Sequence, residues 1–225
     1  MMRKDYITYN IALCENLMEQ GFKRKNKNEF IRKQNQANNI LLFAHGTYHE
    51  RFVRYYTISV FNSFPEVDRI VHSMGTYIGA FGLPIGVLCN NGHFKDWRIA
   101  DNDAEPYIEN VVNEMTYAIT DYAIPFLDKY STYIDVIQGF ENKEIHKSID
   151  EKKILPILYL IVGEKEKALD YIDHKLDYVK QKNPYAEEIK KLQNSSNRCD
   201  NFTFPINKSI IDYTDFANRF RKYAK

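Results

Sequence analysis

The chain has 225 residues, with 31 Lys and Arg against 30 Asp and Glu, so its formal net charge is +1. Contents of 44% hydrophobic and 27% charged residues exclude a disordered chain, a collagen-like chain and a polybasic nucleic-acid tail. The longest nearly apolar run, residues 78–89, is interrupted by Gly and Pro and is too short to span a bilayer. The N-terminal residues lack the apolar segment of a secretory signal. Three widely spaced cysteines favour reduced thiols and a cytoplasmic location.

The first 61 residues predict one helix followed by strands. Apolar residues recur at helical spacing over residues 4–20, and Gly21 stands where a helix-ending glycine is expected. Two short extended segments are predicted within the basic stretch 22–35. Residues 39–44 form a compact apolar run that is typical of a central strand, and residues 52–61 are rich in β-branched and aromatic residues. Between these strands we expect a turn around Gly46.

The middle of the chain changes in character after a short helix that starts at Pro65 and ends near Ser73. Five of the nine glycines fall within residues 75–92. Extended segments at 83–88 and 94–100 are predicted to pair across the Asn90–Asn91–Gly92 turn, because Asn-Gly is a strong hairpin signal.

The remainder reads as helical. A long amphipathic helix is predicted over residues 104–130, with Asp101 or Asp103 as its cap. Pro125 is expected to bend this helix or to end it near Asp121, since proline removes a helix hydrogen bond. A short helix over 132–140, a helical hairpin over 154–182 and a last helix over 209–223 follow.

This order of elements predicts an α+β fold. We expect a mostly antiparallel sheet of four to six strands flanked by helices, followed by an α-helical C-terminal region. The predicted division is an α+β domain at residues 1–130 and a helical region at 131–225 packed on or beside it.

Several short words carry a family resemblance over about residues 10–130. They are Gly21–Phe22–Lys23–Arg24–Lys25, Phe30–Ile31–Arg32, Trp97–Arg98–Ile99 and Ile124–Pro125–Phe126–Leu127. This pattern resembles the bacterial domain-of-unknown-function 4304 family. That family has no established activity, so the resemblance implies no functional residues. Its members often lie in bacterial toxin–immunity neighbourhoods, which implies a protein-binding role.

A second resemblance is local. Residues 157–169 are similar to the turn of a tetratricopeptide helix pair, with the small Ala168 allowing close helix approach. Since a stable solenoid needs at least about three repeats, one hairpin predicts a packing element rather than a peptide-binding array.

A basic block is the first candidate binding feature. Six cations lie within eleven residues: Lys23, Arg24, Lys25, Lys27, Arg32 and Lys33. Such a block suits an acidic protein or, less well, nucleic acid. The alternative is a solvated edge hairpin whose lysines prevent strand-to-strand aggregation. We take Lys23, Arg24, Lys25 and Arg32 as candidate binding residues.

An acidic block balances the basic one. Residues 101–121 contain six acids, and no Lys or Arg lies between Arg98 and Lys129. The near-zero net charge is therefore a cancellation of two blocks, which predicts a polarised surface. Such a surface favours a charged partner or head-to-tail self-association.

The glycine-rich segment is the second candidate binding feature. Gly79 and Gly82, with Trp97 nearby in sequence, suit a small-molecule pocket in which the backbone approaches a ligand. The alternative is a bent strand in which glycine relieves steric conflict. His45 and His49, and Cys89 and His93, have four-residue spacings but lack the motifs of metal or nucleophilic sites. We therefore predict no catalytic residues, metal or cofactor.

The sequence favours a bacterial cytoplasmic protein that acts as a non-catalytic protein-binding module, similar in role to immunity proteins or chaperones. Its expected partner is another protein, such as a toxin or a secreted substrate, with no membrane association and with nucleic acid disfavoured. The alternative is a small-molecule-binding protein or enzyme that uses the glycine-rich segment 75–92.

Overall fold

The predicted α+β class is confirmed by a computed structural model, which describes residues 2–48, 53–89, 95–100, 102–146, 149–181 and 205–225. The chain divides into two compact units. The sheet unit comprises Met1–Pro65 and Gly79–Ile149, and the helical unit comprises Glu66–Ile78 and Asp150–Lys225. The helical unit thus includes a segment from the middle of the sequence.

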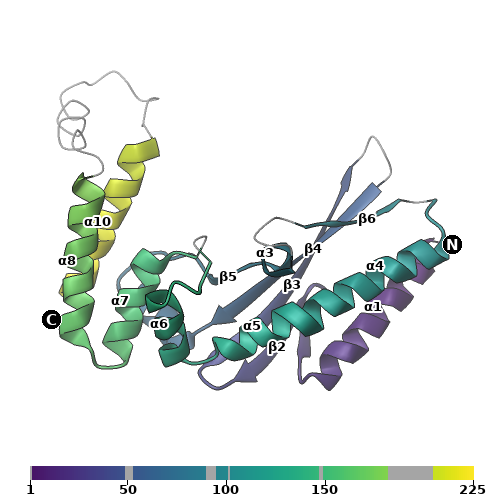
Figure 1. Cartoon of the computed structure of the whole chain (residues 1–225), viewed down its shortest axis with the longest axis horizontal. Coiled ribbons are helices and arrows are strands. Elements are labelled where there is room, and N and C mark those ends of the chain that lie inside the picture. The colour runs from purple at the N-terminus through teal and green to yellow at the C-terminus, as the bar shows by residue number, and fades with distance from the viewer. Residues whose placement is uncertain (1, 49–52, 90–94, 101, 147–148, 182–204) are drawn as a thin grey trace. The chain divides into compact units, whose positions relative to one another are not determined.

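The sheet unit is built on a six-stranded antiparallel sheet (Figure 1). Its strand order is β1-β2-β3-β4-β5, and β6 also pairs with β4. The strands are β1 (Lys23–Asn26), β2 (Glu29–Gln34), β3 (Ala37–Tyr48), β4 (Val53–Ser63), β5 (Phe81–Pro84) and β6 (Trp97–Ala100). The long β3–β4 pair, which keeps one register from Asn38–Ser63 to Tyr48–Val53, forms the centre of the sheet.

The predicted hairpin between residues 83–88 and 94–100 is wrong. β5 and β6 each pair with β4, at its 59–62 and 53–56 segments, instead of with each other. After Pro84 the chain forms the short helix α3 (Ile85–Cys89), and the Asn90–Asn91–Gly92 turn lies outside the described residues. The eleven-residue strand β4 offers both segments an edge to pair with, which a local turn signal does not reveal.

The predicted turn around Gly46 is also wrong, because β3 continues through Gly46 to Tyr48. Gly46 lies directly opposite Tyr55 in the β3–β4 ladder. A Cβ at Gly46 would meet the Tyr55 ring at 2.2 Å, so the tyrosine ring lies across the glycine. Glycine is used here for a close cross-strand contact within a strand and not for a turn.

Helices of the sheet unit cover one face of the sheet. α1 (Met2–Glu19) and α4 (Glu105–Ala118) lie side by side (Figure 1). α1 ends as predicted at Gly21, whose φ of +84° is favourable for glycine. The remaining helical segments are η1 (Ile119–Ala123), α5 (Ile124–Lys129) and α6 (Tyr133–Glu141). α6 corresponds to the helix predicted over residues 132–140, with Thr132 as its N-cap.

The predicted helix of residues 104–130 continues past Pro125 through a π-helical turn, η1. Proline has no amide hydrogen to donate four residues back. The amide of Ile124 donates to the carbonyl of Ile119, five residues back, so the wider turn is accommodated just before the proline. Asp103, one of the two predicted caps, does not cap the helix but accepts from the amide of Ala100 at 2.6 Å, and the other, Asp101, lies outside the described residues.

The helical unit contains α2 (Pro65–Ser73), α7 (Glu151–Ile161), α8 (Lys165–Gln181) and α10 (Pro205–Tyr223). Gly163, with a φ of +87°, joins α7 to α8 as the predicted hairpin. α10 packs on α8. Its Arg219 donates to the carbonyls of Met74 (3.0 Å) and Gly75 (2.6 Å), which satisfies carbonyls left free where α2 ends.

Candidate functional site

The sheet has two unlike faces, which the burial pattern of β4 reveals. Tyr56, Ile58, Val60 and Asn62 are buried, whereas the alternate residues of β4 are half-buried throughout. Because successive side chains of a strand point to opposite faces, one face is covered and the other is partly exposed to solvent. β4 is an interior strand, with β3 on one side and β5 and β6 on the other. If helices also covered its second face, the side chains on that face would be fully buried, and they are not. We call this second, partly exposed side of the sheet the open face.

A continuous row of side chains crosses the open face. Residues directly opposite one another in an antiparallel sheet lie on the same face. The register places Lys23, Ile31, Ile40, Phe61 and Gly82 opposite one another in turn, from β1 to β5. This central row therefore spans five strands, about 19 Å, with three apolar side chains between a cation and a glycine.

The neighbouring row extends the apolar area. It runs from Glu29 through Leu42 and Ser59 to Pro84. Leu42 is 38% exposed, which is unusual for a leucine in an interior strand of a sheet. Leu42 and Pro84 of this row therefore extend the apolar centre of the open face, with the polar Glu29 and Ser59 on either side of Leu42.

Two aromatic rings on the open face lie over glycines. The Phe61 ring crosses Gly82, where an added Cβ would approach Cδ1 of Phe61 to 2.2 Å. Tyr55 crosses Gly46 in the same manner. A ring that lies over the neighbouring strand does not project from the sheet, so these cross-strand pairs keep the apolar surface flat.

Lysines on the open face gather at its β1–β2 end, whereas Arg98, opposite Tyr55 on the same face, forms an ion pair with Asp96 at 3.2 Å. Lys23 ends the central row and is exposed, and Lys33 is the next residue after Ile31 on the same face of β2. Lys25 forms an ion pair with Glu29 at 3.0 Å. The Arg24 guanidinium donates to the carbonyls of Asn26 and Lys27, both at 3.1 Å, and so holds the β1–β2 turn.

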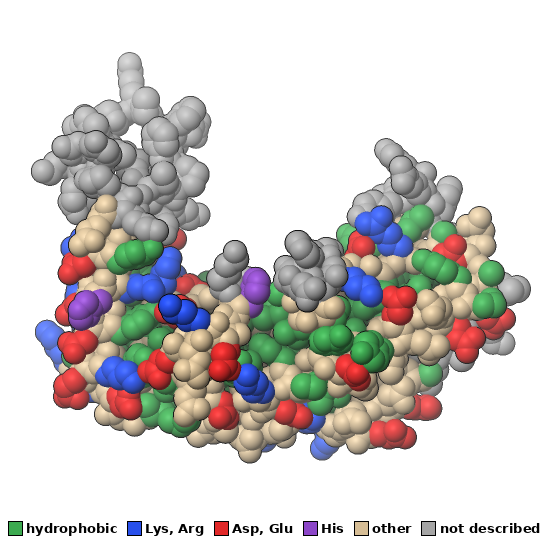
Figure 2. All heavy atoms as spheres, in the orientation of Figure 1, with side chains coloured by type: hydrophobic (Ala, Val, Ile, Leu, Met, Phe, Trp, Pro, Cys, Tyr) green, Lys and Arg blue, Asp and Glu red, His purple; other side chains and the backbone are tan. Residues whose placement is uncertain are grey.

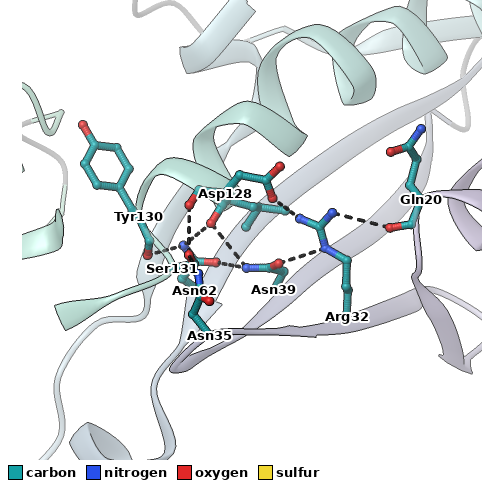
Figure 3. A network of polar contacts seen from close by, with 9 residues as sticks. Gln20, Arg32, Asn35, Asn39, Asn62, Asp128, Tyr130 and Ser131 are labelled. Atoms are coloured by element: carbon teal, nitrogen blue, oxygen red, sulfur yellow. Dashed lines mark hydrogen bonds and ion pairs between the residues drawn. The ribbon is translucent and has the colours of Figure 1, made fainter. Parts of the chain in front are cut away.

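Arg32 takes part in a different arrangement, the polar network in Figure 3. Its guanidinium lies 4.8 Å from the Phe22 ring centroid, donates to the Asn39 side chain at 3.0 Å and forms an ion pair with Asp128. The Arg32 side chain is only 13% exposed. Arg32 therefore stabilises the covered side of the sheet and is separated from the open face.

Two buried asparagines complete this network. Asn39 donates to the Asn62 side chain at 2.7 Å, and Asn62 donates to the carbonyls of Leu127 (3.2 Å) and Tyr130 (2.7 Å). These carbonyls lie at the end of α5, where helical partners run out. Side chains from β3 and β4 thus satisfy the C-terminus of α5, which is a structural role.

The structure does not bring the other predicted site residues to the open face. Trp97 lies opposite Tyr56 on the covered face and is 3% exposed, and within the described residues its indole N–H has no hydrogen-bond partner. A Cβ at Gly79 would meet nothing within 4 Å, whereas Gly86 lies against the backbone of Lys95. Among the described residues of the glycine-rich segment, Gly82 shares the central row with Lys23 and the others do not.

Three acids of the acidic block, Glu105, Glu109 and Glu114, lie on α4. Glu105 and Glu109 are exposed, and Glu114 forms an ion pair with Lys95 at 3.0 Å. Acidic and hydrophobic side chains lie together over α4 in Figure 2. Since α4 packs on the covered side of the sheet through Val111 and Met115, its exposed acids and the open face belong to opposite sides of the unit.

Groups with reactive chemistry are dispersed. Among the described residues, no three or more His, Cys, Asp or Glu side chains gather as a metal site would require. His45 is exposed on β3, Cys89 lies on α3, and His49 and His93 lie outside the described residues. Burial raises the pKa of the Cys14 thiol, which keeps this thiol protonated and unreactive.

Ile40, Leu42 and Phe61 were missed as surface residues by the sequence reasoning. The run Ile40–Leu41–Leu42–Phe43–Ala44 indicates a strand buried on both faces. In β4 the alternation of Thr57 and Ser59 with Ile58 and Val60 was the signal of a one-sided sheet.

Comparisons with known proteins identify no relative: no family model, no curated protein and no solved structure matches this chain. Among the described helices, none has the length and apolarity that a transmembrane span requires.

Proposed function

We propose that this chain is a non-catalytic protein-binding module whose docking surface is the open face of its sheet. The supporting observation is the central row, in which Ile31, Ile40 and Phe61 form a flat apolar strip open to solvent. Contiguous exposed apolar surface is costly in water, and on folded proteins it commonly marks a binding site. A partner that covers the strip removes from water the apolar surface that stays exposed in the folded chain, and this burial favours binding.

The residue types of the open face favour a protein as the partner. At its centre the side chains of Ile31, Ile40 and Leu42 are aliphatic, and the Phe61 ring is held flat against Gly82. Such a surface suits the apolar centre of a protein interface, which aliphatic and aromatic side chains fill. A non-catalytic role of this kind is that of immunity proteins and of chaperones, and we place this activity in the bacterial cytoplasm.

Affinity purification from the producing cells tests this proposal with Leu42→Asp as the informative variant. A buried aspartate desolvates at high cost, so this variant should lose a partner that the wild-type chain retains. Met18→Asp is the matched control, because Met18 is 54% exposed and lies on α1, away from the open face. Proteins retained equally by all three baits, with none that depends on Leu42, would contradict the proposal.

A further inference from the structure

The position of the charges on the open face carries information about the partner. Lys23 and Lys33, which we call the end cations, lie at the β1–β2 end of the central row. Glu29 on the same face is already paired with Lys25 at 3.0 Å. At the opposite end, the two rows finish at Gly82 and Pro84, which carry no charge. The two rows are therefore apolar through their centre and positive at the β1–β2 end. Arg98, which also lies on the open face opposite Tyr55, is held in an ion pair with Asp96 at 3.2 Å.

We infer that the occupant of the open face is an acidic, apolar segment of a different protein, lying with its carboxylates over the end cations and its apolar side chains over Ile40 and Phe61. This inference rests on the proposed function and specifies the partner's chemistry and direction. Carboxylates placed beside Lys23 and Lys33 gain charge complementarity, and apolar side chains gain burial on the central row. A segment bound in the reverse direction would place carboxylates on Gly82 and Pro84, where no cation balances them.

Two other occupants fit less well. A single-stranded nucleic acid needs cations along its backbone and ring faces free for stacking. In the two rows of the open face the cations are confined to one end, and Arg98, farther along the face, is paired with Asp96. A second copy of this chain would supply acids that stand on helices, such as Glu105 and Glu109 on α4 or Glu166 and Asp170 on α8, and binding of a second copy is an outcome that the cross-linking below detects.

Carbodiimide cross-linking of the full-length chain in lysate of the producing cells tests the inference directly. The reagent joins a lysine amine to a carboxylate that lies in direct contact with it, so the linked peptides report which residues meet. The expected products link Lys23 or Lys33 to Asp or Glu of another protein, and they are absent from the Leu42→Asp variant. Links from these lysines to any Asp or Glu of a second copy of this chain would overturn the inference, and so would capture that nuclease abolishes.

Charge reversal separates this inference from the proposed function. Lys23→Glu with Lys33→Glu should lower the recovery of the Leu42-dependent partner at least about tenfold. The new carboxylates would then repel the carboxylates of the partner segment. The matched control reverses Lys180 and Lys222, two exposed lysines of the helical unit. Unchanged recovery with the first pair overturns the inference and leaves the proposed function standing. Absence of any Leu42-dependent partner contradicts the proposed function itself.

A milder pair guards against misfolding. Lys23→Gln with Lys33→Gln removes the charges without creating repulsion, and circular dichroism establishes whether each variant is folded. The neutral pair should lower partner recovery several-fold, less than the reversal does. Full recovery with the neutral pair would overturn the inference even if the reversed pair failed to fold.

Discussion

Buried amides at two positions fix the end of α5 on the sheet. Asn62 is buried, and both of its amide hydrogens donate to helix carbonyls while its side-chain oxygen accepts from Asn39. Each polar atom of the Asn62 side chain thus has a hydrogen-bond partner. A sequence shows two asparagines in two strands and gives no sign that they meet residues 127 and 130. That contact depends on where the helix ends, which is a property of the assembled fold.

We predict that Asn62→Ala lowers the free energy of unfolding by about 2–4 kcal/mol. It leaves the Tyr130 carbonyl buried without a donor, leaves the Leu127 carbonyl with only the 3.4 Å contact from Asn39, and removes the acceptor of the Asn39 amide. A buried polar group left without its partner costs about 1–3 kcal/mol. Urea denaturation measures the change. Asn113→Ala, at an exposed site on α4, should change the same quantity by less than about 0.5 kcal/mol. An equal effect of both substitutions would refute the role assigned to the network.

The two glycines of the open face should respond differently to alanine. At Gly82 an added Cβ meets backbone, with the Val60 carbonyl oxygen at 2.3 Å and Cα of Phe61 at 2.8 Å. Gly82→Ala should therefore destabilise the chain by about 1–3 kcal/mol. At Gly46 the obstacle is the far end of the Tyr55 side chain, which can rotate away, so Gly46→Ala should cost less than about 1 kcal/mol. Thermal denaturation of both variants checks this order, and the reverse order would count against it.

Tyr171 makes the helical unit sensitive to alkaline pH. Burial, and secondly the hydrogen bond to Glu151 at 2.6 Å, raise the pKa of the Tyr171 hydroxyl above its ordinary value. Above about pH 10 the unfolded chain releases this proton and the folded chain retains it, so stability falls as the pH rises.

We predict that Tyr171→Phe flattens this alkaline loss of stability. Urea denaturation at a series of pH values from about 9 to 11 measures the slope. Tyr178→Phe, at an exposed ring on the same helix, serves as the control and should keep the wild-type slope. A Tyr171→Phe slope equal to that of the wild-type chain would show that this hydroxyl does not govern the effect.

At the scale of elements, periodic segments were predictable and pairings were not. The helices α1, α2, α6, α7, α8 and α10 follow from apolar spacing, and Gly21 and Gly163 end helices as expected. Apolar spacing and helix-ending glycines lie within one helical turn of the residues whose conformation they determine, so they can be read from the local sequence. The partners of β5 and β6 depend instead on the free edge of β4, which is distant in sequence.

The π-helical turn before Pro125 shows the same limit. Pro125 predicts a bend or the end of the helix, because proline cannot donate a hydrogen bond. The residues around it, Ile119, Ala123, Ile124 and Leu127, are buried against the sheet unit, and that burial favours a continuous helix. The π-helical turn lets the helix continue although Pro125 has no amide hydrogen to donate. Whether such a proline ends a helix or widens one turn depends on the packing around it, which the local sequence does not show.

The candidate site was predictable in part. The basic block identified Lys23, and the glycine segment identified Gly82, yet no sequence signal joined them because 58 positions separate them in the sequence. The register of four strand pairs places them in one row. Arg32 and Trp97 have the residue types of binding sites, but both side chains lie on the covered side of the sheet.

At the scale of the whole chain, the +1 net charge conceals a separation of charge across the sheet unit. The end cations lie on the open face, and the exposed acids of α4 lie on the covered side. The flat apolar strip between the end cations and β5 is the feature that most needs a partner, since it remains in contact with water in the isolated chain.

The most direct test of this account is photo-cross-linking inside the producing cells with a benzophenone amino acid at position 42. Position 117 on α4, where Tyr117 is 56% exposed, serves as the comparison site. The account predicts one adduct of defined mass at position 42, containing a second protein, and no such adduct at position 117. No adduct at position 42, or the same adducts at both positions, would contradict the claim that the open face binds a protein partner.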